Sequence, residues 1–321
     1  MPTRRAILAT PLLAGPALAQ AEAWPSRPVT MIVPWAAAGS NDVTARLLAP
    51  ALEARFRQPF ITENRPGGGG SVGMAMASRA RPDGLTVLIS SASNHVFHPL
   101  ISNEVGYDVR EAFHGVAMLA DVPNVLAVHP SVPAQTLAEL LVWIRAQRGG
   151  AAYGSSGVGS SNHLTGELLR IRTGADISHV PYRGGGPALI DLISGTIPMA
   201  VMNLPTLVPA AEAGRVRLIG VATAQRVSLK PELPTIQEQG VPDFSVRSWV
   251  GAFVPRGTPR PIIEALTGGF RDALETPAAR QRLRDIGSEP IYMDAVTTDA
   301  FVAAEYARWT PVVRAANVRI E

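Results

Sequence analysis

The chain has 321 residues, of which 46% are hydrophobic and 17% charged, with 29 Lys and Arg against 26 Asp and Glu. This length accommodates one large domain or two medium-sized domains with a sizeable core. The absence of cysteine excludes a disulfide framework, a thiolate metal site and a cysteine nucleophile.

The first 19 residues have the pattern of a signal peptide. Arg4 and Arg5 precede an apolar run that ends in Ala17-Leu18-Ala19, a typical cleavage sequence. We expect cleavage after about Ala19 and export of the mature chain, by either the Sec or the twin-arginine route. Cleavage leaves 27 basic against 26 acidic residues, and this near-neutral balance argues against nucleic-acid binding.

In the first part of the mature chain, short apolar runs alternate with segments of helical periodicity. Strands are predicted at 29–33, 60–63 and 85–90, helices at 41–56 and 71–80, and a glycine-rich turn at 66–70. Asn41 or Asp42 is expected to cap the first helix. This alternation favours a parallel sheet with helices on both faces.

A second series of the same kind begins after residue 121. The predicted strands are 125–129, 151–154, 177–182, 198–202, 216–223 and 248–254. The predicted helices are 136–148, 162–173, 186–194, 207–213, 261–275, 277–286 and 297–316. Two α/β units, the first completed by the C-terminal segment, fit this order better than one sheet of ten strands.

Three motifs that could carry chemistry do not match their templates. The run 67–70 lacks the Lys and the spacing of a phosphate loop. Gly154-Ser155-Ser156-Gly157 would need glycine at Val158 to form a nucleophile elbow. His95 and His98 have no acidic or histidine partner nearby in the sequence, so packing is a better interpretation than metal binding. We predict no metal site, no cofactor and no catalytic residues.

Loops rich in small residues connect three of the predicted strands to helices. They are 35–42, 155–163 and 183–186. Helix N-termini present unpaired N–H groups with partial positive charge, and ligands bind at the carboxyl ends of strands in α/β sheets. Ordinary helix capping is the alternative for each loop alone. Together the three loops favour an anion-binding cleft, to which Gly184 would contribute. Arg183 would either add positive charge to this cleft or remain an exposed, solvated side chain.

From Trp24 onward the chain resembles the solute receptors of tripartite tricarboxylate transporters, the Bug family of periplasmic binding proteins. The segments that carry the resemblance occur in family order: WPSRPVTMIVPWAAAGSNDVTARLLA, ENRPGGGGSVG, PDGLTVLISSASNH, VPNVLAVHPSVPAQTLAEL, YGSSGVGSSNHLTGELL, HVPYRGGGPALIDLISG, NLPTLVPAAEAGRVRLIGVAT, LPTIQEQGVPDF and SWVGAFVPRGTP. No single segment is diagnostic, and the ordered set is specific.

The resemblance implies a two-domain α/β fold of the type II-like periplasmic binding proteins. Each domain is then a mainly parallel sheet flanked by helices, and the ligand cleft lies between the domains. Domain I is expected to comprise 24–122 and 247–321, and domain II 123–246. The chain would cross between them near 121–124 and 245–248.

The resemblance also implies a function. We expect a monomeric periplasmic protein, not an enzyme, that captures a small organic anion, commonly a carboxylate, and delivers it to a membrane permease. One alternative is a secreted α/β hydrolase or isomerase, although the loops offer few titratable groups for an acid, a base and a nucleophile. Another is a periplasmic ligand sensor, which would use the same cleft.

In the family, the first loop and the Gly/Ser loop of the second domain hold the carboxylate through backbone N–H groups, hydroxyls and water. Carried over to this sequence, and with the third loop added, the expected ligand-binding residues are Trp35, Ala37, Ala38, Gly39, Ser40, Asn41, Asp42, Ser91, Ser93, Asn94, Ser156, Gly157, Val158, Gly159, Ser160, Ser161, His163, Arg183, Gly184 and Asn203. Gly157 and Gly159 would let the ligand reach backbone donors, unless they are needed only for a positive φ.

Two positions depart from the family pattern. Trp35 stands in a first loop that often reads Pro-Phe-x-Pro-Gly-Gly, and Met202-Asn203 stands where Asp-Asn is usual. Trp35 enlarges the aromatic surface, and Met202 removes a charge if that position faces the cleft. Both departures argue against assuming the usual small dicarboxylate as the ligand.

Overall fold

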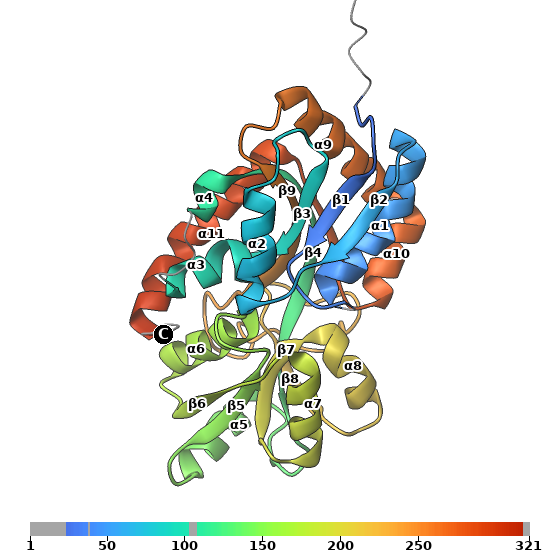
Figure 1. Ribbon diagram of the computed structural model, residues 1–321. Helices are drawn as coiled ribbons and strands as arrows, with labels where there is room; N and C mark the ends of the chain where they lie inside the picture. Colours follow the sequence, from blue (N-terminus) through green and yellow to red (C-terminus); the bar gives the residue numbers. More distant parts are fainter. Residues whose placement is uncertain (1–23, 38, 103–107, 317–321) are drawn as a thin grey trace, which may run out of the picture.

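The computed structural model describes residues 24–37, 39–102 and 108–316, and its elements form two α/β lobes (Figure 1). The predicted signal peptide and Ala38 lie outside the described residues. Among the described residues, no helix combines the length and the hydropathy that crossing a membrane requires.

The upper lobe in Figure 1 combines the N-terminal and C-terminal parts of the chain. Its strands are β1 (Val29–Val33), β2 (Phe60–Asn64), β3 (Thr86–Ser91), β9 (Arg247–Pro255) and β10 (Glu289–Met293). Its helices are α1 (Ser40–Phe56), α2 (Ser71–Ser78), α3 (His98–Ile101), α4 (Val109–Ala112), α9 (Arg260–Glu275), α10 (Pro277–Asp285) and α11 (Ala295–Ala316), with a 3-10 turn at Gly68–Gly70 and a π-helical turn at Ser93–Phe97.

The lower lobe is formed by the middle of the chain. Its strands are β5 (Ala151–Ser155), β6 (Ile177–Pro181), β7 (Met199–Asn203) and β8 (Arg217–Val221). Its helices are α5 (Leu137–Ala146), α6 (Ser161–Thr173), α7 (Gly185–Ser194) and α8 (Leu204–Glu212).

One long strand, β4 (Phe113–Val128), runs through both lobes. The ten strands of the described residues form a continuous sheet with the order β2-β1-β3-β9-β4-β7-β5-β6, and β8 and β10 pair with β4. Neighbouring strands are parallel in β2-β1-β3 and in β7-β5-β6, whereas β4 and β9 pair antiparallel with all their neighbours. The two predicted units therefore share one sheet rather than forming separate sheets.

The partner of β4 changes within one residue step. Pro123 is in register with Arg247 of β9, and the next residue, Asn124, is in register with Asn203 of β7. The returning chain lies beside this point, because the N–H of Ala222 donates to the carbonyl of Asn124 (2.8 Å) and the N–H of Val246 donates to the carbonyl of Ala222 (2.7 Å). These contacts support the predicted domain division and crossings, which we retain as a proposal.

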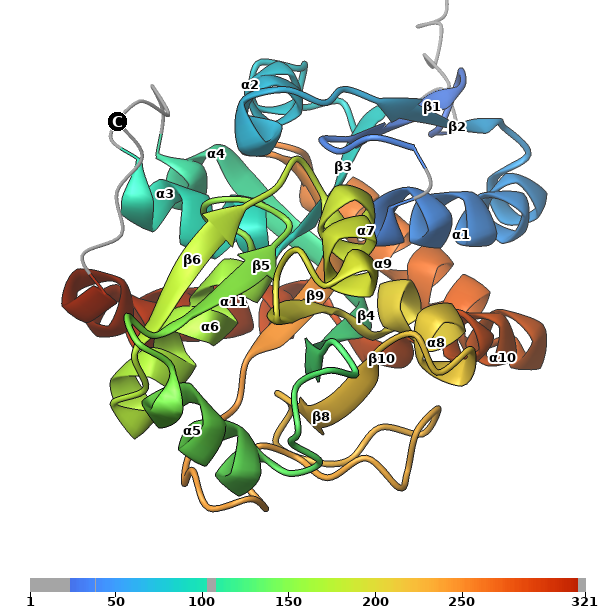
Figure 2. The same cartoon turned by 90° about the horizontal axis from the view of Figure 1, so that it is seen from below.

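Alternate residues of a strand point to opposite faces of the sheet and pack against different helices. In β4, Val125 and Ala127 pack with α7 and α8, whereas Leu126 and Val128 pack with α5 and α6. In the upper lobe, α1, α9 and α10 cover one face, and α2 and α11 cover the other. Figure 2 shows the same layering from below. Because both faces are covered, the strands carry near-continuous apolar runs.

The sequence predictions of the strands and helices are largely confirmed. The exceptions are β10 and the short helices α3 and α4, which were not predicted, and β4, which was predicted only at 125–129 and begins at Phe113. Gly115, Asp121 and Pro123 interrupt the apolar pattern there, and strand pairing on both sides outweighs their low strand propensity. The predicted N-cap of α1 is also wrong, since Gly39 holds that position and Asn41 and Asp42 lie inside the first turn.

Candidate functional site

In the upper lobe, Trp35 lies just after β1 and contacts the turn that follows β3. Its Nε1 donates to Oδ1 of Asn94 (2.7 Å), and Ser91 Oγ donates to the same oxygen (3.3 Å). Asn94 Nδ2 in turn donates to the carbonyl of Gly69 (2.9 Å). The structure thus brings together three of the predicted site residues, while Ala37 is exposed at the edge of the loop.

The first turn of α1 has no side-chain cap. Gly39 is the N-cap, and glycine has no side chain that could accept a hydrogen bond from the first turn. Asn41 is buried and donates to the carbonyl of Ile89 (3.4 Å), while the buried carboxylate of Asp42 pairs with Arg46 (2.9 Å). These two side chains therefore hold the helix in place, and the backbone N–H groups around Ser40 are the groups suited to an anion.

In the lower lobe, the backbone N–H groups of Gly157 and Gly159 in the Gly/Ser loop (155–163) are bonded within the loop. Gly157 N donates to Ser155 Oγ (3.0 Å), and Gly159 N donates to Nδ1 of His163 (3.2 Å). Ser160 caps α6 by accepting from the N–H of His163 (3.2 Å). Gly157 and Gly159 have φ values of 121° and 75°, so the backbone itself favours glycine at both positions.

A pair of neutral histidines lies under this loop. The rings of His163 and His179 stack at 3.8 Å, and His179 Nε2 lies 2.6 Å from Ser155 Oγ. Burial lowers the pKa of His163 to about 4. Burial, together with the neighbouring His163, lowers the pKa of His179 to about 3, although Glu167 opposes the shift. Both rings are therefore uncharged near neutral pH.

The side chain of Asn124 joins three elements of the lower lobe. Its Nδ2 donates to Thr165 Oγ1 (2.9 Å), and its Oδ1 accepts from Nδ2 of Asn162 and from Nδ2 of Asn203 (2.9 Å each). A longer bond from Ser161 Oγ (3.4 Å) reaches the same oxygen. Asn124 is fully buried, so the start of α6 and the start of α8 are fixed against the strand that crosses between the lobes.

Two more helices begin beside Ser156. The N-caps of α7 and α8 are Gly184 and Asn203, and neither makes a side-chain cap. A Cβ placed on Gly185 would lie 3.6 Å from both Ser156 Oγ and Thr206 Oγ1, so these hydroxyls flank the first turn of α7. The first turns of α7 and α8 thus lie near two hydroxyl groups in one region.

The side chains of Arg183 and Met202 lie in different surroundings, solvent for Arg183 and the apolar core for Met202. Arg183 is exposed and makes no ion pair with any described residue. Met202 is fully buried in the apolar core between β7, α7 and α8. Because Met202 does not face a cleft, its replacement of the usual Asp gives no information about the charge of the ligand.

The two lobes meet at the Gly/Ser loop. Ser161 N, in the first turn of α6, donates to Ser93 Oγ of the upper lobe (3.3 Å). A Cβ on Gly159 would lie 2.5 Å from Cδ1 of Ile101, so the glycine makes room for an upper-lobe side chain. Val158 is 40% exposed at the tip of the same loop. Predicted residues of both lobes are therefore in direct contact.

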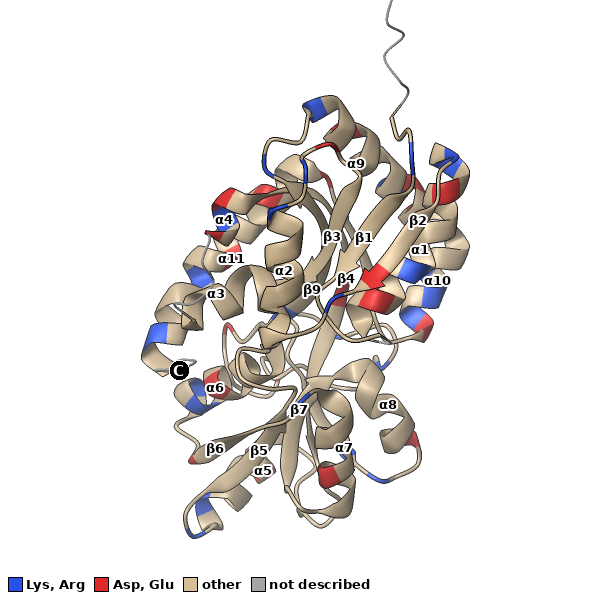
Figure 3. Cartoon of the chain, in the orientation of Figure 1, with Lys and Arg blue, Asp and Glu red and all other residues tan. Residues whose placement is uncertain are grey.

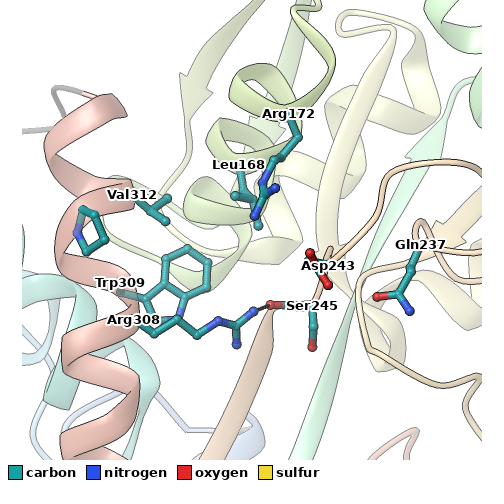
Figure 4. Close-up of a pocket in the computed structure, with 9 residues that line it drawn as sticks. Leu168, Arg172, Gln237, Asp243, Ser245, Arg308, Trp309 and Val312 are labelled. Carbon is teal, nitrogen blue, oxygen red and sulfur yellow. Dashed lines mark hydrogen bonds between the residues drawn. The ribbon is translucent and has the colours of Figure 1, made fainter.

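Asp42 and Arg183 are the charged residues within the three loops, and the main cavity lies away from them. The strands β5, β6 and β7 contain no Lys, Arg, Asp or Glu, and Lys and Arg are distributed over many elements rather than gathered on one (Figure 3). A cavity of about 530 Å³ lies between the C-terminal part of α6, residues 237–245 and α11 (Figure 4), and no predicted site residue lines it. Among the described residues, no group of three or more His, Asp or Glu could hold a metal ion.

Asn124 and Thr206 are not among the predicted site residues, and Asn162 was predicted only as part of the loop 155–163. Asn124 was placed only in a predicted crossing, and an asparagine between Pro123 and Val125 gives no signal of its own. The one available clue was the position of a polar residue at the start of an apolar strand, where the chain changes lobes.

We predict that acid destabilises the protein through the two stacked histidines and through His95, whose pKa burial lowers to about 3. In the unfolded chain these histidines become protonated below their ordinary pKa of 6.5, whereas in the folded state they stay neutral down to about pH 4. The free energy of unfolding therefore falls as the pH drops from 6.5 to about 4. The expected loss is on the order of 2 kcal/mol per histidine. Urea unfolding at pH 7.5, 6, 5 and 4.5 measures it. His163→Asn should flatten the profile, and an unchanged slope in that variant would contradict the assignment.

Comparison with known proteins identifies relatives along almost the whole chain. The model of the tripartite tricarboxylate transporter family receptor matches residues 44–318. BugT of Bordetella pertussis is 34% identical over 315 residues, which cover 98% of this chain and 96% of BugT.

Two solved structures of relatives hold carboxylates. Rpa4515 of R. palustris with adipate superposes with a TM-score of 0.86 at 36% identity, covering 92% of this chain and 99% of that chain. MatC (Rpa3494) from Rhodopseudomonas palustris with bound malate has a TM-score of 0.80 at 30% identity, covering 90% of this chain and 100% of that chain. Such likeness confirms the predicted two-domain fold of the periplasmic binding proteins. The chain therefore belongs to the tripartite tricarboxylate transporter receptor family and is a solute-binding receptor of the Bug type.

Proposed function

We propose that the protein binds a small organic carboxylate between its lobes in the periplasm and delivers it to the membrane permease of a tripartite transporter. The observation that carries the proposal is the set of helix starts without side-chain caps, at α1 in one lobe and at α7 and α8 in the other. Relatives with bound adipate and malate support the ligand class. Residues 1–19 have the pattern of an export signal, which supports the periplasmic location.

The site would hold its anion with neutral donors. Helix N-termini supply backbone N–H groups with partial positive charge, and Trp35, Ser156, Asn203 and Thr206 surround them with polar and aromatic groups. The exposed Arg183 is not required for this arrangement. Because such donors are strong only when water is excluded, we propose that the lobes close over the ligand.

An enzymatic function finds one specific observation in its favour. Ser155 Oγ and His179 Nε2 are 2.6 Å apart, which is the spacing of a nucleophile and its base. However, Ser155 is fully buried, and no carboxylate of the described residues forms a hydrogen bond with His179. We therefore favour binding without turnover. A sensor would use the same cleft and differs only in its partner.

We predict that carboxylates stabilise the protein and leave it unchanged. A ligand at a hundredfold excess over Kd adds about 2.7 kcal/mol to the free energy of unfolding, which raises Tm measurably. The measurement is a thermal-shift screen of mono-, di- and tricarboxylates and aromatic acids, followed by NMR of each hit with the protein. Catalytic consumption of a hit would refute the receptor, as would the absence of any stabilising acid.

We also predict that a tight ligand makes the molecule more compact. The proposed donors are divided between the lobes, so only a closed state contacts the ligand from both sides. Small-angle scattering should show a smaller radius of gyration with ligand. The fluorescence of Trp35 should change in parallel, and Trp35→Phe separates its signal from those of the other tryptophans. A saturating ligand that alters neither scattering nor amide-exchange protection of the loops would contradict closure.

A further inference from the structure

In the hydrogen bonds around Asn124, one backbone carbonyl determines which group donates and which accepts. Thr165 Oγ1 donates to the carbonyl of Ser161 (2.7 Å). A carbonyl oxygen can only accept, so the single proton of Thr165 is committed to this bond. Thr165 Oγ1 can then only accept from Asn124, which must present its NH₂ group.

The orientation of the Asn124 amide also determines the donor and acceptor roles of Asn162, Asn203 and Ser156. With its NH₂ on Thr165, Asn124 presents its carbonyl oxygen to Asn162 and Asn203, and both must donate to it (2.9 Å each). Asn162 consequently presents its own carbonyl oxygen to Ser156, whose Oγ lies 2.7 Å away. Ser156 is therefore the donor in this last bond.

Ser156 has only one proton, and that proton is used. Its Oγ is half-buried beside the first turn of α7, and what it can still offer a ligand is a lone pair. A carboxylate oxygen, which is also only an acceptor, would be repelled there. Oδ1 of Asn203 accepts no hydrogen bond from any described residue, so a second acceptor lies at the start of α8.

We propose that Ser156 accepts a hydrogen bond from a hydroxyl group of the ligand, and that the site thereby selects hydroxycarboxylates over the corresponding unsubstituted acids. This inference rests on the proposed function. The carboxylate would take the N–H groups of the helix starts, and the hydroxyl would take Ser156. An ammonium group is less suited, because the positive ends of α7 and α8 lie beside Ser156.

Thr165 and Asn124 act in this account as positioning residues. They do not touch the ligand, and they determine which atom Ser156 presents. Loss of the Thr165 hydroxyl would free Asn124 to turn its amide, after which Asn162 and Ser156 could reverse in the same way.

The experiment compares acids that share a carbon skeleton. Dissociation constants are measured by calorimetry for succinate, malate and aspartate, for glutarate, 2-hydroxyglutarate and glutamate, and for propionate, lactate and alanine. In at least one set the hydroxy acid should bind about tenfold tighter than the unsubstituted acid, the effect of about one hydrogen bond. The amino acid should not bind better than the hydroxy acid.

Two variants test the mechanism. Ser156→Ala should reduce the preference for the hydroxy acid to less than about threefold. Thr165→Val should also reduce it, although Thr165 lies away from the ligand. Ser178→Ala, at an exposed serine of β6, and Thr298→Val, at a fully buried threonine of α11, are the matched controls and should keep the wild-type preference.

Each outcome bears on a separate claim. Equal binding of hydroxylated and unsubstituted acids, or a preference that survives in folded Ser156→Ala protein, would overturn the inference and leave the carboxylate receptor intact. If none of the acids in these sets or in the thermal-shift screen binds, the proposed function itself fails. Circular dichroism and Tm of each variant establish that it is folded. Should Thr165→Val fail to fold, Ser156→Ala alone decides the question.

Discussion

The side-chain amide of Asn124 is the interaction on which the arrangement of the site depends. It lies at the residue where β4 passes from one lobe to the other, and it binds the start of α6 and the start of α8 at once. A buried amide must satisfy its polar groups, and here it does so with side chains of the proposed site. The crossing between the lobes and the geometry of the cleft are thereby set by the same residue.

The proposed site would recognise an anion without a buried cation. The strands that lead into it carry no charged residues in the lower lobe, and Asp42 of the upper lobe is paired with Arg46. Helix starts attract a carboxylate only moderately and depend on the exclusion of water. In the proposed function, neutral donors would couple binding to the closing of the lobes, as a receptor that must later release its ligand requires.

The sequence predicted the elements of this fold well and the bonding within the site poorly. Apolar runs and helical periodicity sufficed for β1, α6 and α9, because local pattern and burial agree there. The start of β4 was missed because Pro123 and Asp121 obscure a strand that is fixed by its neighbours on both sides. Within the site, the sequence indicated the Gly/Ser loop. It could not show that Gly157 and Gly159 donate inside the loop, since that depends on the positions of Ser155 and His163.

The proposed function requires a carboxylate to lie between the lobes at the helix starts. A crystal structure of the protein with the tightest acid from the screen tests it most directly. We expect carboxylate oxygens within about 3.2 Å of backbone N–H groups in the first turns of α1, α7 or α8, with Ser156 Oγ beside the ligand. A ligand bound instead in the cavity between Arg172 and Arg308, with the helix starts empty, would contradict it.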